Sequence, residues 1–433
     1  MKKRHLLILV LALIVSLLAA CSGSGGTGSS EDSGGTGAED SAANSGEGGT
    51  IVFYGFSDWM DTDPYKEQYE AAKAQFEEEF PGFTVELQSD PWGDWEQKYK
   101  TMFASGNAAD VFMVNNPDFP SFANSGNLLA LGDYVDAGYF DSFFPGVNGM
   151  YVWQNEQMAI PFTTDCRILW YNKDIFTAAG LDPEKPPTTW EELVTYAKAI
   201  EEKTDSYGFG MDLGLQEFPA QSLYCASSGD IIEVADDGSV TPNVNTDEFK
   251  GYMNTLLEMK PTFEADYTIL NHHDVAKLFV EGQMGIIIGN TLNDTDIYDK
   301  EWYGQGLIPS IDGKTNGSFG GGFGISISSE CKYPEQAVRF AQIVTSPEYC
   351  SKLISDVPAS EEGIAQSEMA KDAKYDLYFE QIQYARQAEP KTLYYAEIDM
   401  AVYDAVTEVL VGGKSVDDAV AALEENIKSI TAK

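Results

Sequence analysis

Residues 50–87 read TIVFYGFSDWMDTDPYKEQYEAAKAQFEEEFPGFTVEL, and this stretch decides the fold class. The apolar run at residues 51–54 predicts a short buried strand. Asp63 and Pro64 predict the N-cap and first turn of a helix, because an Asp side chain accepts bonds from the first N–H groups and Pro fits there without one. Apolar residues at helical spacing continue to a Pro-Gly pair, and residues 84–87 predict a second strand. Strand, helix and strand in this order are typical of an α/β protein.

The same alternation continues along the chain. Further strands are predicted at residues 111–114, 168–171, 285–289 and 324–327, and further helices at residues 96–105, 190–203, 334–345, 368–387, 394–411 and 415–430. Thr189 and Glu192 have the spacing of a capping box at the start of the helix predicted over 190–203. Each predicted strand is an unbroken apolar run, which indicates burial of both strand faces and therefore a mostly parallel α/β sheet.

The composition narrows the classes of function. The chain has 433 residues, with 27 basic and 69 acidic side chains and a formal net charge of −42. We therefore expect no nucleic-acid partner, because neutralising phosphates requires a basic face. The 23 Phe, 23 Tyr and 7 Trp residues are too many for a disordered body. The length indicates two or three domains, or two large lobes.

The N-terminus is typical of an exported lipoprotein. Basic residues at positions 2–4 precede an apolar run at residues 6–20, which is too short to span a bilayer comfortably. Cys21 follows Leu-Ala-Ala, as in a bacterial lipobox. We therefore predict that residues 1–20 are a lipoprotein signal peptide and that Cys21 is the lipid-modified residue. An ordinary secretory signal followed by a chance Cys is the alternative.

A tether is predicted between the lipid and the folded body. Residues 21–49 consist of the Cys and a Gly/Ser-rich stretch without aromatic or large aliphatic side chains, which predicts a flexible segment. No later apolar run approaches the length of a membrane span. We therefore expect the body to lie at the extracytoplasmic face of the cell membrane, held there only through the N-terminal lipid.

Cysteine and histidine usage gives no sign of a metal or another cofactor. Cys166, Cys225, Cys331 and Cys350 show no CxxC spacing, so a zinc site is not indicated. An exported protein can form disulfides, and the pairing stays open, but buried free thiols are the favoured interpretation. The adjacent His pair at 272–273 is expected in an exposed loop, because neighbouring side chains point apart and make poor metal geometry.

Several segments resemble the extracellular solute-binding proteins of ABC importers, specifically the maltose-binding-protein-like group that takes sugars. The segments are PWGDW at 91–95, ASGNAADVFMVN at 104–115, LWYNK at 169–173, PPTTWEEL at 186–193 and GGGFGISI at 320–327. Each motif is weak alone. Their order along residues 50–430, after a lipobox, makes the resemblance specific.

The resemblance implies a two-lobe, type II periplasmic-binding-protein-like α/β fold with a ligand cleft between the lobes. By analogy, lobe 1 comprises residues 50–162 and 319–355, and lobe 2 comprises residues 163–318 and 356–433. It also implies a function without catalysis or cofactor. A monomer captures a sugar or oligosaccharide outside the membrane, and lobe closure delivers it to the transmembrane subunits of an ABC permease.

A sugar site needs aromatic platforms, together with carboxylates or amides that bond hydroxyl groups. Ligands of open α/β sheets lie beyond the carboxyl ends of strands, so residues just after each predicted strand are candidates. The resemblance adds Asp165, at a position that often carries a ligand-binding acid, and Glu217 in a similar loop. The candidate ligand-binding residues are Ser57, Asp58, Trp59, Trp92, Asn115, Asn116, Asp165, Glu217, Asn290, Thr291, Tyr394 and Tyr395.

Some candidates have structural alternatives. Asp58 could cap a helix or turn, and either Trp92 or Trp95 could face the core, since they are one helical turn apart. Many sugar-binding relatives carry Trp soon after the strand that matches 285–289, whereas this chain has no aromatic residue there. The missing platform could be supplied by Tyr394, Tyr395 or Trp302.

Other functions stay open on the sequence. The same fold could bind a peptide, a polyamine or another non-sugar solute, and the acidic composition would suit a polyamine. An extracellular lipoprotein glycosidase would also combine acids with aromatics, but it needs two carboxylates at a set separation, and no enzyme signature accompanies them. An adhesion or scaffold lipoprotein would need no cleft.

Overall fold

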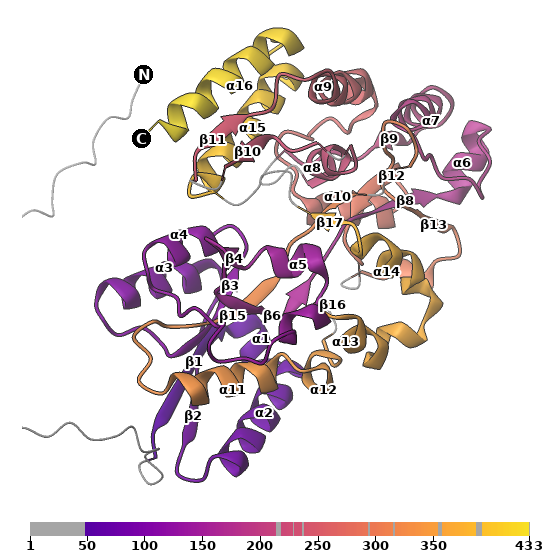
Figure 1. The fold of residues 1–433 in the computed structure, drawn as a ribbon. Coiled ribbons are helices and arrows are strands. Elements are labelled where there is room, and N and C mark those ends of the chain that lie inside the picture. The colour runs from indigo at the N-terminus through magenta and orange to yellow at the C-terminus, as the bar shows by residue number, and fades with distance from the viewer. Residues whose placement is uncertain are drawn as a thin grey trace, which may run out of the picture. The chain divides into compact units, whose positions relative to one another are not determined.

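We describe the protein from a computed structural model that covers residues 48–213, 218–227, 229–235, 238–292, 295–314, 317–353, 357–386 and 392–432. These residues belong to one compact unit, Gly46–Lys433, whose elements are labelled in Figure 1. The predicted signal peptide, Cys21, most of the tether and Glu217 lie outside the described residues. Within the described residues, no helix is long and apolar enough to cross a membrane.

One sheet has five strands in the order β2-β1-β3-β15-β6. Its strands are β1 (Thr50–Phe56), β2 (Thr84–Asp90), β3 (Val111–Asn115), β6 (Ala159–Pro161) and β15 (Phe323–Ile327). β1 runs parallel to β2 and β3, whereas β15 runs antiparallel to β3 and β6. The strands predicted at 51–54, 84–87, 111–114 and 324–327 are confirmed.

A second sheet has four strands in the order β13-β8-β12-β9. Its strands are β8 (Ile168–Asn172), β9 (Tyr207–Phe209), β12 (Met284–Gly289) and β13 (Tyr303–Gly306). β8 is antiparallel to β12 and β13, and β12 is parallel to β9. In strand direction both sheets are mostly parallel, as expected, because only β15 in the first sheet and β8 in the second run against the other strands. An unbroken apolar run reports that both strand faces are buried, but it does not tell which single strand of a sheet is reversed.

Helices cover both sheets, as Figure 1 shows. The longer helices are α2 (Tyr65–Glu79), α3 (Trp92–Ala104), α7 (Trp190–Lys203), α9 (Asp247–Met259), α10 (His272–Val280), α11 (Pro334–Val344), α15 (Tyr395–Leu410) and α16 (Val416–Thr431). α2 packs against α11 beside the five-stranded sheet, and α15 packs against α16 and α9. The capping box predicted at α7 is confirmed, since the side chains of Thr189 and Glu192 bond each other's backbone.

Short elements connect these parts. The short helices are α1 (Ser57–Met60), α4 (Phe119–Asn124), α5 (Pro145–Gly149), α6 (Lys173–Ala179), α8 (Phe218–Cys225), α12 (Pro347–Cys350), α13 (Glu361–Gln366) and α14 (Asp376–Ile382). The two-stranded pairs are β4 (Val152–Trp153) with β5 (Glu156–Gln157), β7 (Thr163–Thr164) with β16 (Val357–Pro358), β10 (Ile232–Val234) with β11 (Val240–Pro242), and β14 (Ser318–Phe319) with β17 (Ala385–Arg386). The 3₁₀ turns are η1 (Tyr139–Ser142), η2 (Lys260–Thr262), η3 (Ile297–Asp299), η4 (Met369–Lys371) and η5 (Ala373–Tyr375).

The helices predicted at 334–345, 394–411 and 415–430 are confirmed, but the single helix predicted at 368–387 is wrong. This region forms η4, η5, α14 and then β17. The Asp372 side chain accepts a bond from the Lys374 N–H and so favours a fresh turn over a continuous helix.

Predicted helix starts also differ in places. Pro64, not Asp63, occupies the N-cap of α2, and no side chain caps this helix. α3 begins at Trp92, before the predicted start of 96. The His pair at 272–273 lies in the first turn of α10, where the Asn271 side chain supplies the cap, so the expected loop is wrong.

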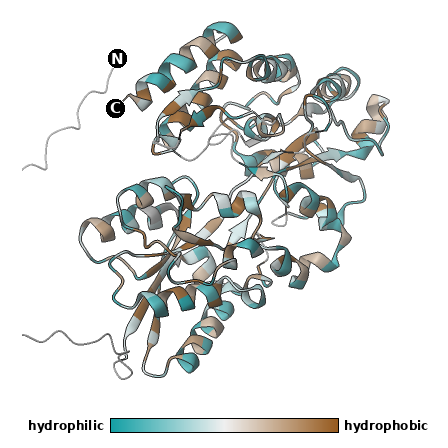
Figure 2. Cartoon of the chain, viewed as in Figure 1, coloured by the Kyte–Doolittle hydropathy of each residue, from teal (hydrophilic) through white to brown (hydrophobic). Residues whose placement is uncertain are grey.

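Strand β8 shows why the strands lack an alternating pattern. Ile168 and Trp170 belong to a hydrophobic cluster that is shared with the five-stranded sheet, whereas Leu169 and Tyr171 pack into a second cluster with α7, α9, α15 and α16. All four side chains are buried. Neither face meets water, so the period of two does not appear in the sequence. Figure 2 shows apolar residues concentrated along the strands.

The favoured interpretation of the cysteines is confirmed for the described residues. Cys166, Cys225 and Cys350 are buried free thiols, and Cys331 is a half-buried one. Burial raises the pKa of the Cys166 and Cys350 thiols well above the ordinary range, so both are held as unreactive neutral thiols.

Candidate functional site

Segments that connect the two sheets lie side by side. β7 leads from β6 toward β8, and the glycine run 320–322 leads from β14 to β15, while β17 pairs with β14. Close approach explains the glycines. A Cβ on Gly322, whose φ is +133°, would lie 2.2 Å from the Thr163 carbonyl oxygen, and one on Gly320 would lie 2.6 Å from the Ala385 Cβ.

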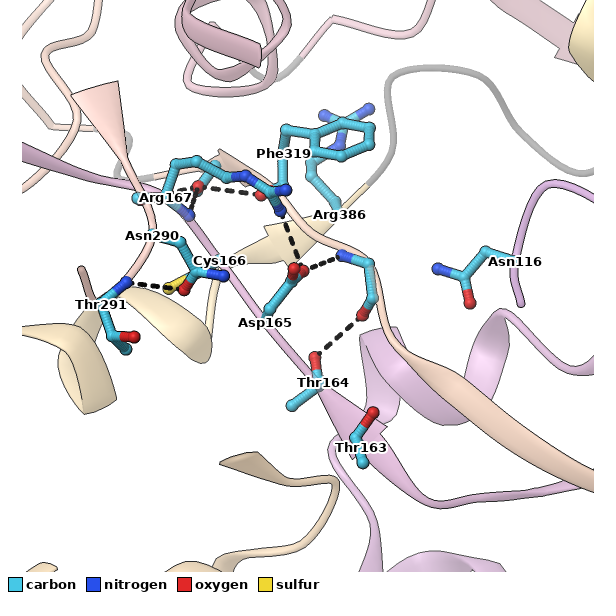
Figure 3. A network of polar contacts seen from close by, with 12 residues as sticks. Asn116, Thr163, Thr164, Asp165, Cys166, Arg167, Asn290, Thr291, Phe319 and Arg386 are labelled. Atoms are coloured by element: carbon cyan, nitrogen blue, oxygen red, sulfur yellow. Dashed lines mark hydrogen bonds and ion pairs between the residues drawn. The ribbon is translucent and has the colours of Figure 1, made fainter. Parts of the chain in front are cut away.

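Asp165 lies among these connecting segments, as Figure 3 shows. Its Oδ1 accepts bonds from the Gly321 N–H at 2.6 Å and from the Arg167 Nη1 at 2.9 Å. The Arg167 and Asp165 side chains are only 8% and 15% exposed, so water screens this ion pair weakly. The predicted site acid therefore also ties two connecting segments together.

Arg167 and Phe319 were missing from the sequence-based candidates. The guanidinium carbon of Arg167 lies 5.0 Å from the centre of the Phe319 ring, which is a cation–π contact. The Arg167 N–H donates to the Ser318 Oγ, which in turn donates to the Arg167 carbonyl, both at 2.8 Å. The sequence offered only weak signals for these two residues. Arg167 is a cation two residues after the predicted acid Asp165, and Phe319 is an aromatic residue directly before the glycine run. The result is an aromatic ring, a guanidinium group and a carboxylate in one place.

Asn290 and Thr291 follow β12, whose last residue pairs with the first residue of β8, so they lie at the same end of the four-stranded sheet as Asp165. The Asn290 Oδ1 accepts bonds from the Thr291 N–H at 2.7 Å and from the Tyr378 Oη at 2.8 Å. Thr291 is buried, and its carbonyl accepts a bond from the Tyr298 Oη at 2.5 Å. The structure thus brings Asp165 and Asn290 together, with Tyr378 as a partner that no sequence motif pointed to.

Asn115 and Asn116 follow β3, as predicted. The Asn115 Oδ1 accepts a bond from the Asp118 N–H at 3.2 Å, which closes a turn. Asn116 is buried, and its Oδ1 accepts a bond from the Tyr151 Oη at 2.7 Å while its Nδ2 lies 2.9 Å from the Met150 sulfur. Figure 3 draws Asn116 and Asn290 on opposite sides of Asp165.

Ser57, Asp58 and Trp59 form the short helix α1 directly after β1. Trp59 is buried in an aromatic cluster, where its ring stacks on Tyr65 with centroids 5.3 Å apart and contacts Phe162 edge-on. Asp58 is exposed, and its backbone carbonyl accepts a bond from the Thr62 Oγ1 just after α1. Trp59 therefore packs in the core beside the connecting segments.

The other aromatic candidates are spread over the fold. Trp92 opens α3, but its side chain lies outside the described residues, whereas Trp95 is fully buried in the core. Tyr394 is half-buried at the N-cap of α15, and Tyr395 is buried in its first turn. The Trp302 carbonyl accepts a bond from the N–H of Lys173, which directly follows β8. Trp302 therefore lies at the end of β8 away from Asp165, and it cannot supply the missing aromatic platform beside Asp165.

The described part of the chain offers no cluster of side chains that could bind a metal ion. No group of three or more His, Cys, Asp or Glu side chains in it could hold a metal ion. Asp165, the carboxylate at the site, is already bonded to a guanidinium group.

Comparisons with known proteins place the chain among binding proteins. Residues 61–349 match the family described as bacterial extracellular solute-binding protein. The diacetylchitobiose binding protein DasA of Streptomyces coelicolor is 24% identical over 361 residues, which cover 81% of this chain and 79% of that protein. The sn-glycerol-3-phosphate-binding periplasmic protein UgpB of Escherichia coli is 27% identical over 234 residues, covering 50% of this chain and 52% of that one.

Solved structures show the same fold. The sugar-binding protein MalE from Xanthomonas citri aligns with a TM-score of 0.76 at 22% identity, covering 88% of this chain and 97% of that one. The cyclic alpha-maltosyl-1,6-maltose binding protein from Arthrobacter globiformis aligns with a TM-score of 0.74 at 20% identity, covering 88% and 98%. The expected type II periplasmic-binding-protein-like fold is confirmed. Because the family match covers well over half of its length, this chain belongs to the bacterial extracellular solute-binding proteins.

Proposed function

We propose that the protein captures a sugar or oligosaccharide outside the cell membrane and delivers it to the permease of an ABC importer. The observation that carries this proposal is the group formed by Asp165, Arg167, Phe319 and Asn290 where the connecting segments meet. A sugar presents hydroxyls that both donate and accept, and C–H faces that pack on aromatic rings. This group offers an acceptor, donors and a ring together.

Names of similar proteins support a carbohydrate ligand. DasA is named for diacetylchitobiose and MalE for sugar binding, and both align over most of this chain. UgpB is named for a phosphorylated glycerol, so an anionic ligand belongs among the controls. At this site the nearby guanidinium of Arg167 is already neutralised by Asp165, which favours a neutral polyhydroxyl ligand.

Capture without chemistry is the proposed mechanism. Lobe 1 would comprise residues 50–162 and 319–355, and lobe 2 the remaining residues of the body. The Ala359 N–H donates to the Phe162 carbonyl, and β16 pairs with β7 directly after Phe162. We therefore place the last crossing of the chain from lobe 1 to lobe 2 after Ala359 rather than after residue 355. Closure around the sugar would exclude water and strengthen the polar contacts, and the ligand would shift the lobe equilibrium only by its differential affinity for the two forms.

A glycosidase is the less supported reading of the same residues. Hydrolysis needs a second carboxylate at a set distance from the first, with one of the two protonated. Here the site carboxylate, Asp165, accepts bonds from a guanidinium group and a backbone N–H. Both bonds hold the Asp165 carboxylate in place as a hydrogen-bond acceptor, which suits a binding site.

Membrane attachment rests on the sequence. We propose that Cys21 carries the lipid, that the monomeric body reaches the permease through the tether, and that the lipid is its only hold on the membrane. Metabolic labelling with a radioactive fatty acid in a bacterial host tests this part. Label should enter the wild-type protein and be absent from Cys21→Ser; equal labelling of both would contradict it.

A thermal-shift panel tests the proposed ligand class. The purified protein is heated with maltose, maltotetraose, xylobiose, N,N′-diacetylchitobiose, glycerol 3-phosphate, spermidine and a tripeptide. A ligand at 100 times its Kd stabilises the folded state by about 2.7 kcal/mol, which gives a clear shift in Tm. A shift with sugars alone supports the proposal. A shift only with spermidine, the peptide or glycerol 3-phosphate would keep the family and overturn the sugar.

A further inference from the structure

The orientation of the Asn290 side chain follows from its hydrogen bonds. Its Oδ1 lies 2.7 Å from the Thr291 backbone nitrogen, and an N–H group can only donate. Exchanging the amide oxygen and nitrogen would set two donors against each other, so the assignment is fixed by the network. Figure 3 shows that the Asn290 nitrogen points toward the side on which Asp165 lies.

Tyr378 adds a second and independent constraint. Its Oη accepts a bond from the Cys166 N–H at 3.0 Å, which directs the hydroxyl proton to the Asn290 Oδ1 at 2.8 Å. Tyr378 lies on α14 and is 1% exposed, so its ring is packed in the core. Two donors therefore converge on the Asn290 oxygen, one from the next residue of the chain and one from α14.

The Asn290 nitrogen is left for another partner. Asn290 is half-buried, and within the described residues no acceptor is hydrogen-bonded to its Nδ2. An amide whose oxygen is held by two donors presents its two N–H groups in a fixed direction. Pre-organised donors bind better than mobile ones, because little side-chain entropy is lost on binding.

We propose that Tyr378 is a positioning residue, which holds the Asn290 amide as a fixed donor for the solute bound beside Asp165. This inference rests on the proposed function. It also specifies the ligand: the atom that meets Asn290 is an acceptor oxygen, while Asp165 meets a hydroxyl that donates. Neighbouring hydroxyls of a sugar satisfy both requirements.

A thermodynamic cycle separates this role from a structural one. Binding of the panel sugar with the largest thermal shift is measured by calorimetry for the wild type, Tyr378→Phe, Asn290→Ala and the double variant. We expect Tyr378→Phe to raise Kd about 5- to 20-fold, and to have no further effect when Asn290 is already Ala. Equal effects of Tyr378→Phe in both backgrounds would overturn the inference.

Tyr349→Phe is a matched control for the lost hydroxyl. Tyr349 is also buried, and its Oη donates to the Gln75 Oε1 on α2 at 2.7 Å, so its hydroxyl does not bond Asn290. This variant should lower the free energy of unfolding but leave Kd unchanged. If it raised Kd as much as Tyr378→Phe does, the effect would be one of general stability and the inference would fail.

A second readout needs no ligand. The side-chain NH₂ signals of Asn290 are assigned by their absence from the NMR spectrum of Asn290→Ala. In Tyr378→Phe we expect them to move and to exchange faster with water, whereas Tyr349→Phe should leave them in place; unmoved signals would overturn the inference. Failure of the wild type to bind any sugar would instead refute the proposed function, so the two failures are distinguishable.

Discussion

Replacing Asp165 with Ala tests how the connecting segments are held. The change removes the acceptor of two hydrogen bonds, from the Gly321 N–H at 2.6 Å and from the Arg167 Nη1 at 2.9 Å. It leaves the Arg167 guanidinium, with a side chain only 8% exposed, without its counter-ion. Breaking one partner of a buried pair costs about 3–5 kcal/mol, and this range includes the orphaned polar groups. We therefore expect the free energy of unfolding to fall by about that much.

The assay is urea unfolding at pH 7, followed by Trp fluorescence. Arg167→Met keeps the bond from the Gly321 N–H to Asp165 and fills a similar volume, so it should cost less than Asp165→Ala. The double variant Asp165→Ala, Arg167→Met has no unpaired charge, and it should recover about 2 kcal/mol of the sum of the single losses. A loss below about 1 kcal/mol for Asp165→Ala, or strict additivity, would refute the reasoning.

Three other expectations concern pH, packing and thiols. Burial raises the pKa of Glu264 to about 7, above its unfolded value, so its contribution to stability is full below about pH 4 and is lost as the pH rises through 7. Urea unfolding of the wild type should therefore lose roughly 2–4 kcal/mol relative to Glu264→Gln between pH 4 and 8; parallel pH profiles would contradict this. Gly322→Ala should cost at least about 2 kcal/mol more than Gly413→Ala, because a Cβ at 322 meets backbone at 2.2 Å whereas one at 413 meets nothing within 4 Å; equal melting temperatures would contradict it. Native protein should react slowly with a thiol reagent at its buried cysteines and fully after unfolding in denaturant, and rapid labelling of Cys166 by mass spectrometry would show that its site opens readily.

Much of the fold was predictable because the strands are short apolar runs between helices with apolar residues at helical spacing. The runs at 51–54 and 168–171 mark strands buried on both faces, and the helix over 190–203 carries its cap in its own sequence. The reversed strands β15 and β8 were not predictable, because burial alone does not show which strand of a mostly parallel sheet runs against the others. The helix expected at 368–387 failed because a local Asp cap competes with helix continuation, and hydrophobic spacing does not report that competition.

The candidate site was only partly predictable. Asn290 was found because polar residues just after a strand lie at one edge of a sheet, whereas Asp165 was found through the resemblance to the solute-binding family. Trp59 was chosen for its chemistry, but it packs among other aromatic rings. Tyr378 could not be found, since it bonds the Cys166 N–H across 212 positions of sequence. Contacts of this kind depend on the tertiary fold and leave no periodic pattern.

The central claim is that the protein binds a sugar reversibly and leaves it unchanged. Isothermal titration calorimetry with the panel sugar that gives the largest thermal shift tests this claim most directly. Mass spectrometry of the sugar recovered from the calorimeter cell then shows whether it is unchanged. The account predicts one site per chain, a negative heat-capacity change from closure over apolar surface, and recovery of the intact sugar. A continuing heat signal with shortened products, or no heat with any sugar, would contradict it.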